Sequence, residues 1–138
     1  MSDTTLDRFL SAQAEDYDTA RTEILAGRKQ THWVWYIYPQ LRGLGSSDRA
    51  HLYGIADLDE ARRYLAHPIL GNRLVEMAET LMMHAGKEPE DILGNIDALK
   101  VRSCMTLFEK VPDAPPVFTQ VLDTFYNGER CPKTLQML

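Results

Sequence analysis

The stretch HWVWYIYPQLRGLG, from His32 to Gly45, decides the fold of this chain and indicates where its site lies. It carries both tryptophans of the chain and two of its six tyrosines. The run from Trp33 to Tyr38 has no polar residue at every second position, so it does not predict a strand with one face in water. Aromatic side chains supply the largest apolar burial per residue. We therefore expect this run to be buried on most sides.

The second half of the stretch predicts a loop. Pro39 removes a backbone donor and disfavours helix at Tyr38, while Gly43 and Gly45 allow positive φ on either side of Leu44. An aromatic segment therefore runs into a kinked loop whose glycines let the backbone approach a ligand closely. A lone Gly-x-Gly is not a dinucleotide fingerprint, because the strand-turn-helix context of that motif is missing.

Polar side chains within the aromatic stretch indicate a ligand pocket. His32 and Gln40 supply polar groups and Arg42 a positive charge, in a region otherwise suited only to a core. Trp33 and Trp35 offer faces on which a ligand ring can stack. The alternative is that the aromatics are core and the rest is a turn, since apolar stripes are far more often packing than binding sites.

Length and composition predict one domain, residues 1–138, with 44% hydrophobic and 25% charged residues. A formal net charge of −5 without any basic run argues against sequence-independent binding to nucleic acid. The N-terminus lacks the regions of a secretory signal, and no apolar run approaches the roughly 18 residues of a membrane span. We therefore expect a cytoplasmic protein without membrane contact, in which Cys104 and Cys131 stay reduced.

Apolar residues recur at helical spacing along nearly the whole chain, which predicts an all-α fold of about seven or eight helices with irregular loops. Asp3 or Thr4 is expected to cap a first helix, and Asp16 a second that Gly27 ends. The further helices are predicted to begin at Ser47 or Asp48 and at Asp57, then to cover Pro68 to Ala85, a short turn after Pro89, Ile96 to Lys110, Pro116 to Tyr126 and a docked tail from Thr134 to Leu138. The helix from Pro68 is expected to be the longest and the central one.

The predicted helix from Ile96 to Lys110 places two charged residues, Asp97 and Lys100, on its apolar face. Charges in an apolar setting are costly unless they are paired or line a wet cavity. One interpretation is a structural ion pair between the two. The other is that Lys100 projects into the cavity walled by the aromatic stretch and receives an anionic group, with Asp97 positioning it and Ser103 at the border. Buried lysines also serve in catalysis, so Lys100, Asp97 and His32 are the candidates for a catalytic role.

No metal site and no cofactor are indicated. A His-x-x-x-His spacing is absent, and neither cysteine stands at a metal-ligand spacing. His51, His67 and His84 fall on predicted helices and are expected to be surface residues or residues with hydrogen-bond partners.

Long motifs along the chain resemble one bacterial family. They are HWVWYIYPQLRGLG at 32–45, YLAHPILGNRL at 64–74, IDALKVRSCMTLFEKV at 96–111, and the ending with Phe125 to Gly128 followed by Thr134 and Leu135. Together they resemble a family of uncharacterised small helical proteins that has sometimes been mislabelled calpastatin. The resemblance implies a mainly α-helical single-domain fold and no established activity. Cys104 stands where that family commonly has a serine, and Cys131 where an aspartate is usual.

A more distant similarity selects the ligand to test first. The aromatic segment, the turn at Leu70 and Gly71 and the lysine-bearing helix are distantly similar to small helical N-glycosidases that act on ADP-ribose and riboflavin-pathway intermediates. This similarity implies a nucleotide- or phosphosugar-like anion as the partner and, for an enzyme, N-glycoside hydrolysis as the first reaction. Two hypotheses follow. The chain either holds a small-molecule site formed by the aromatic stretch with Asp97, Lys100 and Ser103, or is a non-catalytic protein–protein interaction module in which these residues are structural.

Overall fold

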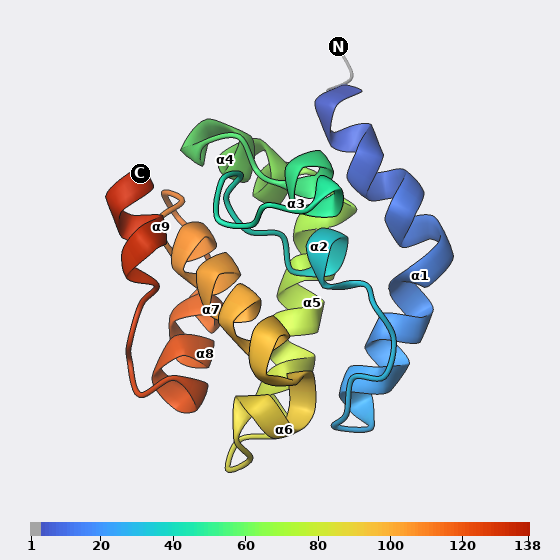
Figure 1. The fold of residues 1–138 in the computed structure, drawn as a ribbon, viewed down its shortest axis with the longest axis vertical. Coiled ribbons are helices and arrows are strands. Elements are labelled where there is room, and N and C mark those ends of the chain that lie inside the picture. Colours follow the sequence, from blue (N-terminus) through green and yellow to red (C-terminus); the bar gives the residue numbers. More distant parts are fainter. Residues whose placement is uncertain (1–3) are drawn as a thin grey trace.

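Helices make up the regular structure of the computed structural model, which describes residues 4–138 (Figure 1). They are a 3-10 turn at Thr4–Leu6, then α1 Asp7–Leu25, α2 Val34–Ile37, α3 Asp48–Tyr53, α4 Leu58–Ala66, α5 Leu70–Met82, α6 Pro89–Leu93, α7 Asn95–Glu109, α8 Val117–Phe125 and α9 Pro132–Met137. Over this part of the chain there are nine α-helices and no strand. The prediction of an all-α single domain is confirmed, with nine α-helices in these residues where seven or eight were expected.

Helix α1 is one continuous helix where the sequence predicted two. Asp16, the predicted cap of the second, lies inside α1, and its carboxylate accepts a hydrogen bond from the Tyr36 hydroxyl. Asp3, a predicted cap of the first, lies outside the described residues. With 19 residues against 13 in α5, α1 is also longer than the helix predicted to be the longest.

The predicted caps of α3 and α4 are confirmed. Ser47 Oγ and the Asp57 carboxylate each accept a hydrogen bond from the backbone N–H three residues later, at 3.1 and 2.9 Å. Helix α5 begins later than predicted, because Nδ1 of His67 accepts hydrogen bonds from the backbone N–H groups two and three residues later, at 3.1 and 3.3 Å. Pro68 therefore stays outside the helix. His84 is also satisfied, since its Nε2 lies 2.6 Å from the carbonyl of Ile24.

The core lies where α5 packs against α1, α4 and α8 and where α7 packs against α8 (Figure 1). Its fully buried side chains include Phe9, Tyr64, Leu74, Met77, Phe108 and Phe118. The aromatic stretch joins this core as predicted: Trp33, Tyr36 and Tyr38 are buried, and only Trp35 among its aromatic residues is half-buried. Helix α2 ends before Pro39, so the predicted break at Tyr38 is also confirmed.

Backbone pairing fixes the loop that follows α2. The N–H of Arg42 donates to the carbonyl of Ile55 at 2.7 Å, and the N–H of Ile55 donates to the carbonyl of Gln40 at 2.9 Å. Gly43 has a φ of +103°, a conformation that favours glycine. Gly45 serves a close approach instead, because a Cβ there would lie 2.8 Å from the Cβ of a residue in α3. The loop is thus held against α3, and Figure 1 shows it between α3 and α9.

Glu23 of α1 anchors the start of the aromatic stretch. Its Oε1 accepts hydrogen bonds from the backbone N–H groups of Gln30 and Thr31, at 2.7 and 2.9 Å, and from Nε1 of Trp33 at 3.0 Å. Its Oε2 accepts one from the Thr31 hydroxyl at 2.7 Å. Partial burial raises the pKa of Glu23, but these hydrogen bonds outweigh it and lower the pKa to about 2.

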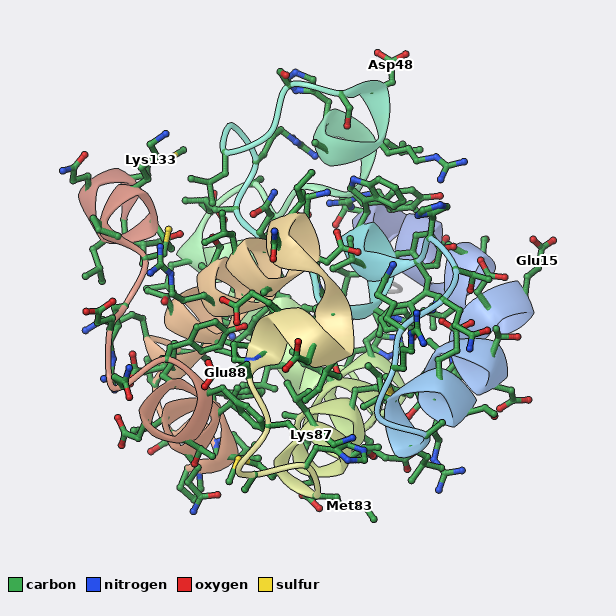
Figure 2. All side chains as sticks on the ribbon, turned by 60° about the horizontal axis from the view of Figure 1, so that its bottom comes forward. Glu15, Asp48, Met83, Lys87, Glu88 and Lys133 are labelled. Atoms are coloured by element: carbon green, nitrogen blue, oxygen red, sulfur yellow. The ribbon has the colours of Figure 1, made fainter. Side chains whose placement is uncertain are left out.

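Acid is therefore expected to weaken the fold through Glu23. The folded-state pKa lies below the ordinary value of 4.5, so the unfolded chain takes up the proton first. The stability that Glu23 contributes is complete above pH 4.5 and is lost as the pH falls towards 2. Urea unfolding between pH 4.5 and 2 should show a smaller loss of free energy of unfolding for Glu23→Gln than for the wild type. Glu15→Gln is the control, since Glu15 points into solvent from the same helix (Figure 2), and it should behave as the wild type.

Candidate ligand pocket

A pocket of about 440 Å³ lies between the loop after α2, the first turns of α7 and the start of α9. We call it the Lys100 pocket. The residues that line it are Gln40, Leu44, Gly45, Ile96, Leu99, Lys100, Arg102, Ser103, Cys131, Pro132 and Lys133. Its volume falls within the range of about 300–1,000 Å³ that is usual for small-molecule sites.

The charges of the Lys100 pocket are all positive. Lys100, Arg102 and Lys133 line it, and none of the lining residues is an aspartate or glutamate. Figure 2 shows Lys133 on α9 at the edge of the molecule. Because the whole chain carries a net charge of −5, this is a local reversal of sign that attracts anions.

The walls of the Lys100 pocket also carry apolar side chains. Ile96 and Leu99, on the first turns of α7, are 71% and 57% exposed, and Leu44 lies in the loop. Exposed apolar surface beside polar groups is typical of a ligand-binding or partner-binding surface. The pocket is therefore complementary to a molecule with an anionic end and an apolar body.

Asp97 has a closer partner than Lys100. Lys29 Nζ lies 2.8 Å from Oδ2 of Asp97, whereas Lys100 Nζ lies 3.6 Å from Oδ1. The Lys29 side chain is 5% exposed, and its ammonium also contacts the carbonyl of Thr31 and lies 5.0 Å from the ring centre of Trp33. Lys29 was not among the site residues predicted from the sequence. Lys100 has the longer of the two ion-pair contacts, and its side chain lines the pocket.

A second, smaller hollow adjoins the Lys100 pocket and shares Gln40 and Lys100 with it. Its volume of about 10 Å³ is close to the space that one water-sized atom needs. Trp35 and Arg49 also line it, and we call it the Trp35 hollow. Two cations lie over the indole of Trp35, with Lys100 Nζ 4.8 Å and Arg49 Cζ 5.0 Å from the ring centre. Nε1 of Trp35 is buried and has no hydrogen-bond partner in the described part of the chain.

Ser103 and Cys131 meet in the wall of the Lys100 pocket. Ser103 Oγ lies 3.3 Å from Cys131 Sγ and 3.1 Å from the carbonyl of Leu99. Burial raises the pKa of the Cys131 thiol, but hydrogen bonds to the sulfur, that of Ser103 first among them, outweigh burial and lower the pKa below its usual value. The pocket therefore contains a thiol that is more acidic than an ordinary cysteine.

The structure brings some of the predicted site residues together. Gln40, Gly45, Lys100 and Ser103 line the Lys100 pocket, and Trp35 lines the adjoining hollow. Asp97 lies next to Lys100 but belongs to the ion pair with Lys29. The predicted meeting of the aromatic stretch with the lysine-bearing helix is thus seen in the contact of Trp35 with Lys100.

Other predicted residues lie outside the walls of both cavities: His32, Trp33, Arg42 and Gly43. His32 is exposed before α2. Trp33 is 1% exposed, and its indole N–H is taken by Glu23, so it belongs to the core. Arg42 is exposed on the surface, and its Nε donates to the carbonyl of His51 at 3.0 Å.

Four further lining residues were not predicted from the sequence: Arg49, Arg102, Cys131 and Lys133. Arg102 follows the exposed Leu99 by three residues on α7, so the helical spacing contained a signal for it. Arg49 comes from α3 and the last two from the start of α9, and their approach to α7 leaves no local pattern. Among the described residues, no three His, Cys, Asp or Glu side chains gather in a way that could hold a metal ion.

Comparison with known proteins places the chain in a family. The sequence model of DUF1810, described as a protein of unknown function, matches residues 3–138. The crystal structure of the conserved hypothetical protein Rv1873 from Mycobacterium tuberculosis is similar, with 44% sequence identity and a TM-score of 0.94 over 96% of this chain and 95% of that one. No curated protein matches. No helix within residues 4–138 has the length and apolar character needed to cross a membrane. The resemblance inferred from the motifs is confirmed, and the chain belongs to the DUF1810 family of proteins of unknown function.

Proposed function

We propose that the Lys100 pocket binds a small amphipathic anion, with nucleotide- and phosphosugar-like compounds as the first class to test. One observation carries this proposal: three cationic and no acidic side chains line a pocket of about 440 Å³ that also has an apolar wall. Cationic side chains in a pocket wall that holds no carboxylate are suited to an anion supplied from outside.

Each wall has a role in such a complex. Lys100 is the central anion contact, because Lys29 holds the carboxylate of Asp97 at the shorter distance. The amide of Gln40 and the hydroxyl of Ser103 supply hydrogen bonds that orient the ligand. The exposed side chains of Ile96 and Leu99 cover its apolar part.

The net charge of −5 and two cysteines without a disulfide partner support a cytoplasmic protein whose partner is a small ligand rather than nucleic acid. They do not bear on catalysis. If the protein is an enzyme, N-glycoside hydrolysis of a bound nucleotide derivative is the first reaction to assay.

Thermal-shift measurements on the wild type and Lys100→Ala test the proposal. The compounds are nucleoside monophosphates, sugar phosphates and ADP-ribose. A ligand at about 100 times its dissociation constant stabilises the folded protein by about 2.7 kcal/mol. We expect at least one compound to raise the Tm of the wild type and to leave that of Lys100→Ala unchanged.

Lys110→Ala is the matched control, because Lys110 is exposed at the far end of α7 and does not line the pocket. It should respond to the ligand as the wild type does. The proposal fails if no compound raises the Tm of the wild type, or if Lys100→Ala responds as strongly as the wild type.

A protein partner is the second candidate, favoured by the exposure of Ile96 and Leu99 at 71% and 57%. The simplest partner is a second copy of the chain. Sedimentation of the wild type over a range of concentrations would then show a dimer that Leu99→Lys dissociates and Lys100→Ala does not. A wild type that stays monomeric excludes this self-association.

A further inference from the structure

We infer that the ligand of the Lys100 pocket carries a terminal phosphate monoester and that one of its oxygens enters the Trp35 hollow, where it accepts a hydrogen bond from Nε1 of Trp35. This inference rests on the proposed function and specifies its ligand.

The two indole N–H groups differ in how they are satisfied. Nε1 of Trp33 donates to Glu23 at 3.0 Å, as expected of a buried donor. Nε1 of Trp35 is also buried, although the residue as a whole is half-buried, and it has no acceptor in the described part of the chain. An unsatisfied buried donor costs stability, so it calls for an explanation, and a bound ligand that accepts from it is one.

The groups around the Trp35 hollow are mainly donors. Arg49 and Lys100 contribute cationic donors, Gln40 an amide and Tyr53 a hydroxyl, and no aspartate or glutamate lines the hollow. The hydroxyl of Tyr38 is used elsewhere, since it donates to a backbone carbonyl of α5 at 2.9 Å. A water molecule brings no negative charge to these two cations, whereas an anionic oxygen brings one and accepts hydrogen bonds from every donor around it. The hollow is therefore better matched to an oxyanion than to water.

Size and charge then select the kind of anion. The hollow of about 10 Å³ admits one atom, so the rest of the ligand must stay in the Lys100 pocket. A terminal phosphate can insert one oxygen and leave the others facing the larger pocket. It carries a charge of about −1.5 to −2 at pH 7, which suits two cations over one indole ring. A phosphodiester or an internal pyrophosphate carries less charge per phosphorus and is substituted on both sides.

Nuclear magnetic resonance of ¹⁵N-labelled protein tests the contact directly. The two tryptophans give two indole N–H signals, and Trp35→Phe assigns them. Inorganic phosphate is titrated at constant ionic strength, with chloride as the matched salt. We expect phosphate to shift the Trp35 signal and leave the Trp33 signal in place. A Trp35 signal that does not move, or that moves equally with chloride, overturns the inference.

Affinity for two adenosine compounds tests the ligand class. AMP carries a terminal phosphate and ADP-ribose an internal pyrophosphate. We expect AMP to bind the wild type at least about tenfold more tightly, and Trp35→Phe to weaken AMP binding about tenfold or more, because a hydrogen bond to a charged group is lost. ADP-ribose binding should be nearly unchanged by this substitution. Trp35→Phe should remain folded, since the Nε1 that it removes has no partner in the structure.

The outcomes separate this inference from the proposed function. If AMP and ADP-ribose bind with equal affinity, both depend on Lys100 and neither responds to Trp35→Phe, the pocket is an anion site but the terminal-phosphate inference is wrong. If no anion binds in a Lys100-dependent way, the proposed function is wrong and this inference fails with it.

Discussion

Gly71→Ala is expected to lower the free energy of unfolding by about 3 kcal/mol, the upper end of the usual cost of overpacking. In an exposed helix interior the same change would stabilise the protein by about 1 kcal/mol. Here a Cβ on Gly71 would lie 2.0 Å from the carbonyl oxygen of Leu65 and 2.8 Å from its carbonyl carbon. These are backbone atoms, so the clash is relieved only if α4 and α5 move apart.

Urea unfolding measures this loss as a lower midpoint with an unchanged slope. Glu79→Ala, an exposed change on the same helix, is the control and should alter the midpoint little. A Gly71→Ala protein as stable as the wild type would show that α4 and α5 do not approach this closely in solution.

The sequence predicted the features of the fold that depend on local chemistry. Ser47 and Asp57 cap helices as expected, and Pro39 ends α2. Asp16 has the same local chemistry as these caps, yet it lies within α1, where its carboxylate accepts a hydrogen bond from the Tyr36 hydroxyl, distant in the sequence. Cap residues are therefore reliable only where no tertiary partner competes for the side chain.

For the candidate site, too, local patterns predicted the segments that form it, but not the contacts between residues distant in the sequence. The helical face that carries Lys100 and Ser103 followed from residue spacing, and the aromatic stretch that meets it followed from composition. The ion-pair partner of Asp97 did not follow from the sequence. Spacing at i and i+3 allowed an ion pair between Lys100 and Asp97 as one of two interpretations, and the loop after α1 brings Lys29 closer to Asp97, at 2.8 Å against 3.6 Å.

That difference predicts opposite roles for the two lysines. Lys29→Met should lower the free energy of unfolding by about 3 to 5 kcal/mol, because it removes the close partner of a carboxylate that is only 17% exposed. Lys100→Met should cost less than about 1 kcal/mol, since Asp97 keeps its bond to Lys29 and the Lys100 ammonium is partly solvated. Urea unfolding of both single variants checks the pair of values.

A double-mutant cycle with Asp97→Asn shows whether the loss arises from the ion pair itself. The double variant of Asp97→Asn with Lys29→Met should lose clearly less free energy of unfolding than the sum of the two single variants, because no charge is then left without its partner. In the double variant of Asp97→Asn with Lys100→Met, the two losses of free energy of unfolding should nearly add. If Lys100→Met proved as damaging as Lys29→Met and coupled as strongly to Asp97, Lys100 would be part of the architecture. The anion contact would then have to come from Arg102 and Lys133, which line the same pocket without that carboxylate.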